Sequence, residues 1–302
     1  MTTSDRKRKS TTETLKKTKK LLIVLGPTAV GKTDYAIERA LEFSSPVVNC
    51  DSRQIFKELC IGVARPDATQ LARVKHYLIA NHSIEEHYTA GLFELEAMAL
   101  LEQLFATHDT LVMAGGSGFY IDALCNGLDD FPPADLTLRQ ALMARLESDG
   151  LENLVAELRE KDPATCEVID LNNRQRVVRA LEVTIATGRP FSSFKSSPAK
   201  QRPFEIEKIG LRRSRESLYR RVDARVDIMM EQGLEQEARN LMPYRHLPAL
   251  NTVGYKELFD YFDGKYPLDE AVRLIKRNTR HYAKKQMTYW RRDDSINWID
   301  LD

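Results

Sequence analysis

The chain has 302 residues, with 45 Lys and Arg against 44 Asp and Glu, and a formal net charge of +1. This near-neutral total excludes a uniformly basic or acidic protein, and the length allows one large or two ordinary domains. The charges are unevenly distributed, because residues 1–20 hold eight basic and two acidic side chains, and residues 273–292 hold eight basic and none acidic. The two basic segments favour a polyanionic partner that binds near the ends of the chain.

Composition excludes further classes of protein. Hydrophobic residues make up 42% of the chain, enough for a core, but no run approaches the roughly 18 uninterrupted apolar residues of a membrane helix. Residues 1–20 lack the apolar region of a signal peptide. The four cysteines, Cys50, Cys60, Cys125 and Cys166, form no CxxC pair, which argues against a zinc site or a disulfide framework. We therefore expect a cytoplasmic protein without membrane association.

Strands and helices alternate in the first half of the chain. After a polar tail at residues 1–20, expected to be disordered, the run LLIVLG predicts a buried strand, followed by a glycine-rich loop and a helix over TDYAIERALEF. Further strands are predicted at PVVNC and at TLVMAGG, with a helix through Leu92, Leu95, Met98 and Leu101 between them. This alternation indicates an α/β fold with a parallel sheet flanked by helices.

From about residue 135 the pattern changes to consecutive helices. We predict a first part of the core at residues 21–134, a helical insertion domain at 135–200, and a return to the core at 201–302. The return begins with a strand at 206–213. A long amphipathic helix follows, marked by Leu218, Val222, Val226, Met229 and Leu234. The last forty residues are predicted to be helical.

Residues 26–33, GPTAVGKT, match the pattern G-x-x-x-x-G-K-[ST] and lie between a predicted strand and a predicted helix, as its mechanism requires. Backbone amides and the helix N-terminus would surround phosphate oxygens, Lys32 would add a point charge, and the Thr33 hydroxyl can bind Mg²⁺. The predicted diphosphate- or nucleotide-binding residues are Gly26, Pro27, Thr28, Ala29, Val30, Gly31, Lys32 and Thr33. This P-loop pattern indicates phosphate binding without specifying the reaction.

Two further strands end in residues of chemical interest. Asp51 follows the second strand and should lie at the carboxyl edge of the sheet, beside the phosphate loop. A carboxylate there suits a metal ligand or a general base, and the alternative is a cap or turn residue. The third strand ends in Gly115-Gly116-Ser117-Gly118 and lacks the acid that nucleotide hydrolases use for Mg²⁺. Its small residues suggest that a substrate passes close to the backbone.

Two segments combine cations with residues suited to nucleic acid. Residues 172–182 place Gln175 and Arg179 on one helical face, with Arg176 close by, although a solvated helix face explains these charges equally well. Residues 273–292 interleave aromatic side chains with cations, which combines phosphate attraction with base stacking. Some of these aromatics must still pack onto the protein. The residues alone indicate a phosphate-binding α/β enzyme with nucleic-acid-binding features.

A series of seven motifs covers roughly residues 21–294. In order, these are GPTAVGKT; DSRQIF with IGVARP; GGSGFY; LNNRQRVVRALEVTIATGRP; RESLYRRVDARVDIMMEQGLEQEA; NTVGYKE; and AKKQMTYWRRD. The series resembles that of bacterial tRNA dimethylallyltransferases. The resemblance implies a P-loop-like core and transfer of a dimethylallyl group from dimethylallyl diphosphate to N6 of adenosine-37, beside the tRNA anticodon. It also implies Mg²⁺ as cofactor and the anticodon stem-loop as partner, and we expect a monomer.

The resemblance assigns roles to particular positions. Thr28, Gly31, Lys32 and Thr33 would bind the leaving diphosphate with help from Arg221, and Asp51 would be the general base, so that Asp51, Lys32 and Thr33 are the expected catalytic residues. The expected tRNA-contacting residues are Asp51, Ser52, Arg53, Gln54, Ser117, Arg139, Gln175, Arg176, Val177, Val178, Arg179, Asn251, Thr252, Val253, Gly254, Tyr255, Lys256, Lys284, Lys285, Gln286, Met287, Thr288, Tyr289, Trp290 and Arg291.

Some positions depart from the usual motifs, and two other functions are compatible with the P-loop. GVARP at 62–66 replaces GTAKP, HYLIA at 76–80 replaces HHLID, and Ser117 replaces Thr, which suggests a divergent branch. A small-molecule kinase that uses ATP is disfavoured by the basic C-terminal segment. An inactive RNA-binding paralogue is disfavoured by the intact Lys32, Thr33 and Asp51.

Overall fold

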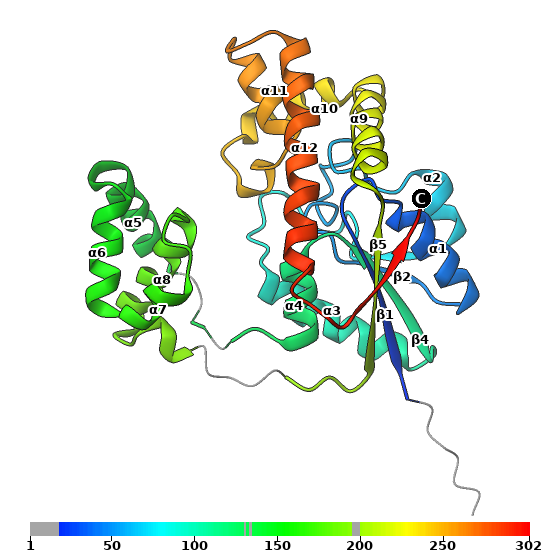
Figure 1. Cartoon of the computed structure of the whole chain (residues 1–302), viewed down its shortest axis with the longest axis horizontal. Coiled ribbons are helices and arrows are strands. Elements are labelled where there is room, and N and C mark those ends of the chain that lie inside the picture. The colour runs from blue at the N-terminus through cyan, green and yellow to red at the C-terminus, as the bar shows by residue number, and fades with distance from the viewer. Residues whose placement is uncertain (1–17, 130, 133–134, 195–199) are drawn as a thin grey trace, which may run out of the picture. The chain divides into compact units, whose positions relative to one another are not determined.

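The computed structural model describes residues 18–129, 131–132, 135–194 and 200–302 (Figure 1). It divides into two compact units, one formed by Met1–Leu124 and Arg202–Asp302, the other by Cys125–Gln201. Most of the tail predicted at residues 1–20 lies outside the described residues. Its last residue, Lys20, already belongs to the first strand.

One six-stranded parallel sheet organises the first unit, in the order β3-β2-β4-β1-β5-β6. The strands are β1 Lys20–Leu25, β2 Val47–Asn49, β3 His76–Tyr77, β4 Thr110–Gly115, β5 Glu205–Arg212 and β6 Ile296–Asp300. All residues of β1 from Leu21 to Leu25 are buried, as expected for the middle of a parallel sheet that is covered on both faces. The predicted α/β fold is confirmed.

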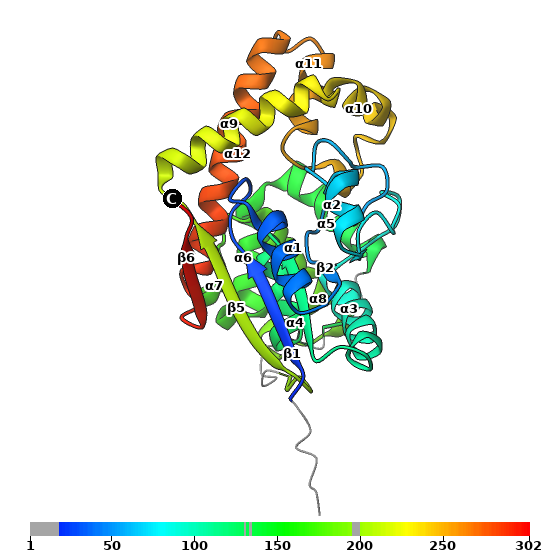
Figure 2. The ribbon, with the colours of Figure 1, turned by 90° about the vertical axis from the view of Figure 1, so that its right-hand side faces the viewer.

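Helices α9, α10 and α11 and the first part of α12 lie beyond the carboxyl ends of the strands, and α12 then continues alongside the sheet (Figures 1 and 2). The helices of this unit are α1 Lys32–Glu42, α2 Ala68–Arg73, α3 Ala90–Phe105, α4 Gly118–Asn126, which extends into the second unit, α9 Arg215–Glu231, α10 Leu234–Leu241, α11 Tyr255–Phe262 and α12 Leu268–Trp290. A hydrophobic cluster that includes Leu234, Leu250, Tyr255 and Ile275 joins them. They therefore form a wall over the sheet edge where Asp51 is predicted.

Two predictions for the C-terminal part of the chain are wrong in detail. The helix predicted through Leu234 ends at Glu231, because Gly233 adopts a left-handed conformation (φ 98°) that separates α9 from α10. The last forty residues are not all helical, since β6 pairs with β5 at the edge of the sheet.

Two of the four apolar positions that predicted the helix before β4 are on its outer face. Leu92 and Leu95 are exposed, and Phe93, Ala97 and Leu101 form the buried face of α3. The helix is present, but its sequence is apolar on nearly all sides and does not mark the core face clearly.

The second unit is helical. It contains α5 Leu136–Asp149, α6 Leu151–Lys161, α7 Pro163–Val168, α8 Arg174–Thr187 and the short 3₁₀ helix η1 Phe191–Phe194. Leucines of α5 and α6 pack against Val177, Val178 and Leu181 of α8 in its own core. The helices fall within the range predicted for an insertion, and the unit begins earlier, at Cys125. Among the described helices of the whole chain, none is both long and apolar enough to cross a membrane.

Candidate active site

The loop between β1 and α1 is shaped to surround an anion. The backbone is left-handed at Ala29 (φ 64°) and Gly31 (φ 114°), and α1 begins at Lys32. The Lys32 ammonium donates hydrogen bonds to the carbonyls of Gly26 and Pro27, both at 2.9 Å. Burial and, to a smaller extent, the charge of Arg225 lower the pKa of Lys32 to about 8, against the opposing effect of the Asp51 carboxylate.

Three arginines contact three successive residues of this loop. Arg225 Nη1 lies 3.3 Å from Thr28 Oγ1, Arg221 Nε donates to the Ala29 carbonyl at 2.8 Å, and Arg213 Nε donates to the Val30 carbonyl at 3.0 Å. The predicted diphosphate ligand Arg221 is thus at the loop. Sequence reasoning missed the other two, although Arg225 follows Arg221 by one helical turn. Burial and the neighbouring charge of Arg221 lower the pKa of Arg225, and the cluster suits a ligand with several negative charges.

Asp51 lies directly after β2, at the same edge of the sheet. Its Oδ1 accepts hydrogen bonds from the backbone amides of Arg53 at 2.9 Å and Gln54 at 3.3 Å, so that it also caps its turn. Within the described residues, Oδ2 accepts no hydrogen bond. A Cβ atom built on Gly116 would lie 3.8 Å from Asp51 Oδ2 and 3.7 Å from Lys32 Nζ. A potential base and a phosphate-binding cation therefore face the same small space.

The residues that follow Asp51 are fixed by contacts with other loops. Ser117 Oγ accepts from the Ser52 amide at 2.8 Å and donates to the Ser52 hydroxyl at 3.0 Å. Gln54 Nε2 donates to the carbonyls of Val63 and Ala64 at 3.1 and 3.0 Å. These contacts hold Ser52 and Gln54 of the predicted tRNA-contacting set in place, and the Gln54 side chain keeps its amide oxygen for a ligand.

Two of the glycines after β4 are needed for close contacts within the protein, and Gly115 also lines the pocket described below. A Cβ on Gly115 would lie 2.4 Å from the carbonyl oxygen of Cys50, and a Cβ on Gly118 would lie 2.3 Å from the ring of Tyr289. The protein itself fills these spaces. Only Gly116 lies beside Lys32 and Asp51, and the side chain nearest to it is that of Gln286.

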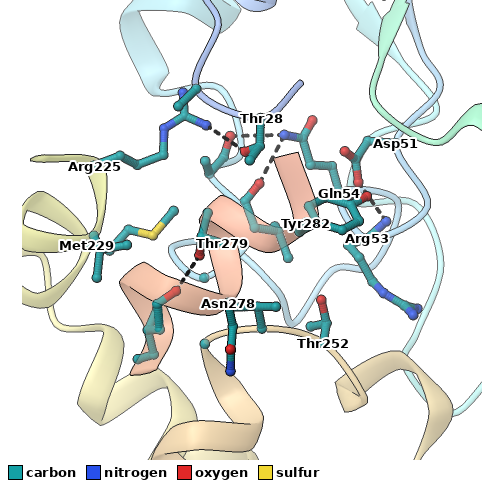
Figure 3. A pocket seen from close by; sticks show the side chains of 18 of the residues that line it. Thr28, Asp51, Arg53, Gln54, Arg225, Met229, Thr252, Asn278, Thr279 and Tyr282 are labelled. Carbon is teal, nitrogen blue, oxygen red and sulfur yellow. Dashed lines mark hydrogen bonds between the residues drawn. The ribbon is translucent and has the colours of Figure 1, made fainter. Parts of the chain in front are cut away.

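A pocket of about 800 Å³ joins these groups to the helical wall. Figure 3 shows Arg225 and Met229 on one side, Asp51, Arg53 and Gln54 on the other, and Tyr282 between them. The lining includes Thr28, Gly31, Lys32, Thr33, Asp51, Ser52, Arg53, Gln54, Arg225, Val226, Met229, Asn251, Thr252, Val253, Gly254, Lys256, Ile275, Tyr282 and Lys285. The phosphate loop, the carboxylate and much of the segment 251–256 thus border one cavity with a partly apolar wall.

Helix α12 presents two different faces. Ala283, Gln286 and Trp290 are buried, whereas Lys284, Thr288 and Arg291 are exposed. Lys285 and Tyr282 line the pocket, Met287 is half-buried, and Tyr289 donates its phenol to Asp122. Of the residues predicted between 284 and 291, only part of the set is therefore available to RNA.

Several cations of the basic C-terminal segment are already paired within the protein. Lys276 contacts Asp227 at 2.6 Å, Arg280 contacts Asp223 at 2.5 Å, and Arg292 contacts Asp122 at 2.7 Å. Asp227 and Asp223 both belong to α9, so the first two pairs attach α12 to α9. This pairing reduces the charge that the segment offers to a polyanion.

The helical unit carries its predicted residues on α5 and α8. Gln175 and Arg176 are exposed, and Val177 and Val178 are buried in the core of the unit. The guanidinium groups of Arg139 and Arg179 both bond to the buried carboxylate of Glu182, at 2.7 and 2.5 Å. Glu182 therefore fixes the orientation of two cations and partly neutralises them.

Glu237 of α10 is a supporting residue that sequence reasoning missed. Its carboxylate accepts hydrogen bonds from the amides of Cys60 at 3.2 Å, Ile61 at 2.8 Å and Gly62 at 2.9 Å. It also accepts from the phenol of Tyr255 at 2.6 Å. Tyr255 is fully buried, so its side chain positions the pocket-lining loop and has no surface to offer to RNA.

Replacing Glu237 with Ala should lower the free energy of unfolding by about 2–4 kcal/mol, because three amides and a phenol lose a charged acceptor. Denaturant unfolding followed by circular dichroism measures this change. Glu235→Ala, on the same helix, is a matched control, because Glu235 forms a surface pair with Arg239, which contributes little to stability. A Glu237 variant as stable as this control would contradict the assignment.

Comparison with known proteins identifies the family. The family model described as IPP transferase matches residues 54–293. The chain belongs to this family. It is 51% identical over 279 residues to tRNA dimethylallyltransferase 2 of Porphyromonas gingivalis, with 92% of this chain and 93% of the relative covered.

Solved structures agree with this membership. The full-length tRNA isopentenylpyrophosphate transferase of Bacillus halodurans superposes with a TM-score of 0.68 at 33% identity, over 93% of this chain and 90% of that one. A eukaryotic dimethylallyltransferase acting on tRNA superposes with a TM-score of 0.78 at 26% identity, over 93% and 74% of the two chains. The family resemblance inferred from the motifs is confirmed.

The donor set of the pocket fits a Mg²⁺ ion that is bound mainly through a substrate. The described residues contain no cluster of three or more His, Cys, Asp or Glu that could bind a metal by itself. Thr33 and Asp51 nevertheless line the same pocket as the phosphate loop. Mg²⁺ typically takes one or two protein oxygens and completes its shell with phosphate oxygens and water. These residues could therefore complete the coordination of a Mg²⁺ diphosphate.

Proposed function

We propose that this protein transfers the dimethylallyl group of dimethylallyl diphosphate to N6 of the adenosine next to the tRNA anticodon. The observation that carries the proposal is that Lys32 of the phosphate loop and the carboxylate of Asp51 line one and the same pocket. An alkyl transfer of this kind requires a site for the leaving diphosphate, which Lys32 marks, and a base for the attacking amine, which Asp51 can provide. Membership of the IPP transferase family supports the same reaction.

In the proposed reaction the adenine N6 forms a bond to C1 of the prenyl donor. The allylic C–O bond breaks, its electron pair leaves with the diphosphate, and the proton of N6 passes to Asp51. Negative charge grows on the diphosphate as the bond breaks, so that the loop amides, Lys32 and the nearby arginines stabilise the transition state more than the ground state. A bound Mg²⁺ would neutralise part of that charge.

The apolar wall of the pocket suits the prenyl group. Val226 and Met229 of α9 and Ile275 of α12 line it, and an apolar surround excludes water from a reactive allylic carbon. The target adenine must leave its stack to reach this pocket, at a cost of a few kcal/mol. Exposed cations such as Lys284, Arg291 and Arg176 offset part of that cost through phosphate contacts.

A transfer assay tests the proposal. Purified protein with Mg²⁺, labelled dimethylallyl diphosphate and unmodified tRNA should transfer label to the RNA, and excess EDTA should abolish the transfer. Nuclease digestion followed by mass spectrometry should locate the label on N6 of adenosine-37. Phosphorylation of a small molecule by ATP without label in the RNA would favour a kinase, and RNA binding without any transfer would favour an inactive paralogue.

A further inference from the structure

We propose that Gln286 of α12 positions the diphosphate site and does not contact tRNA. This inference rests on the proposed function. Its side chain is buried, with 6% of its surface exposed. Oε1 accepts a hydrogen bond from the Thr28 amide at 2.8 Å, and Nε2 donates to the Gly116 carbonyl at 2.8 Å. One amide group thus connects the phosphate loop to the turn after β4.

This contact is tightly packed. A Cβ atom on Gly116 would lie 2.5 Å from Gln286 Nε2, so no residue larger than glycine fits at 116 while the amide keeps its place. On the same face of α12, Ala283 and Trp290 are buried with it. The side chain is therefore fixed by its neighbours on the helix and by the turn that it contacts.

The connection spans the two chemical ends of the site. Thr28 belongs to the loop that binds the leaving group, and its hydroxyl lies near Arg225. Gly116 lies beside both Lys32 Nζ and Asp51 Oδ2. By holding Thr28 and Gly116 together, Gln286 fixes the position of the phosphate loop relative to Asp51. A displacement of about 1 Å between reacting groups can lower the reaction rate by about 10²-fold.

Residues close to Gln286 in sequence lie on the exposed face of α12, and they give the basic C-terminal segment the composition of an RNA-binding surface. Lys284 and Thr288 are exposed, and each is two residues from the buried Gln286, which places them on the opposite side of α12. Both ends of the Gln286 amide bond to the protein itself. RNA that lies on the outer face of α12 therefore meets the lysine and threonine side chains, and the glutamine acts on the donor side.

The test uses the full chain and inorganic pyrophosphate with Mg²⁺ as the probe, measured by calorimetry, beside tRNA binding and steady-state kinetics. In Gln286→Met, two buried groups lose their partner, so the Kd for pyrophosphate and the KM for dimethylallyl diphosphate should both rise about tenfold or more. The Kd and KM for tRNA should stay within about twofold. Gln103→Met, an exposed glutamine on α3, is the matched control and should bind pyrophosphate like the wild type.

A second variant tests the same contact from the other side. Gly116→Ala should displace the Gln286 amide and weaken pyrophosphate binding, and the losses in the double variant should not add. Unchanged pyrophosphate affinity with weaker tRNA binding would overturn the proposal and make Gln286 an RNA contact. Equal losses for both ligands, or additive losses in the double variant, would overturn it as well. If the wild type binds pyrophosphate but transfers no prenyl group, the proposed function fails, and the binding measurements still decide the role of Gln286.

Discussion

Replacing Asp51 with Asn should lower the rate of prenyl transfer at saturating substrates by about 10²- to 10⁴-fold, the usual contribution of a positioned general base. Asparagine keeps a carbonyl oxygen where Oδ1 accepts from the amides of Arg53 and Gln54. The turn should therefore be preserved, and tRNA affinity should stay near normal. The substitution removes only the oxygen that faces Gly116 as a proton acceptor.

The measurements are single-turnover transfer with labelled donor and tRNA binding by filter retention. Asp67→Asn is a matched control, because Asp67 also caps a turn, accepting from the Gln70 amide at the start of α2, and is exposed. Its transfer rate should stay within about twofold of the wild type. If tRNA affinity falls as much as the rate in Asp51→Asn, the residue organises the site and is not the base. Retention of more than a tenth of the rate would also argue against the base.

The phosphate loop and Asp51 could be predicted because their signals are local. The motif from Gly26 to Thr33 needs only a strand before it and a helix after it, and Asp51 ends a short apolar run. Parallel strands bring such ends to one edge of a sheet. Position along the chain therefore translated directly into position in space.

The supporting residues could not be predicted in the same way, because their partners are distant in sequence. Arg213, Arg225 and Glu237 are ordinary charged residues of strand ends and helices until the fold brings Val30, Thr28 and the amides of 60–62 beside them. The sequence of a basic segment likewise does not show which of its cations form ion pairs within the protein. Lys276 and Arg280 contact carboxylates of α9, whose proximity no local pattern reveals.

A helical signal for Gln286 was nevertheless present in the sequence. Gln286 lies about one helical turn after Ala283, and Trp290 lies two turns after Ala283, so that the three share one face. Lys284, Thr288 and Arg291 share the other face. A glutamine between apolar positions on an amphipathic helix indicates a buried amide with partners of its own. The short strand β6 gave a weaker signal, because five residues at a sheet edge with several polar side chains carry little periodicity.

Replacing Lys32 with Met should weaken pyrophosphate binding by about 10²-fold at pH 7, because the ligand loses a charged hydrogen-bond donor. The pH dependence follows from burial, which lowers the pKa of Lys32 to about 8 in the free protein. Below pH 8 the Lys32 ammonium is already charged, so that binding of the anion requires no proton uptake by the lysine. Above pH 8 binding must take up a proton, so that affinity should fall by up to about tenfold per pH unit until the bound lysine itself titrates.

Calorimetry in buffers of different ionisation enthalpy measures this proton uptake at pH 8.5 to 9. Mg²⁺ pyrophosphate ionises in the same way in the experiments with both proteins. The difference in proton uptake between wild type and Lys32→Met therefore reports the protonation of Lys32. Lys161→Met, an exposed lysine of the helical unit, should behave like the wild type. Equal pH profiles for wild type and Lys32→Met would show that Lys32 does not supply the positive charge of the diphosphate site, which would then have to come from Arg213, Arg221 and Arg225.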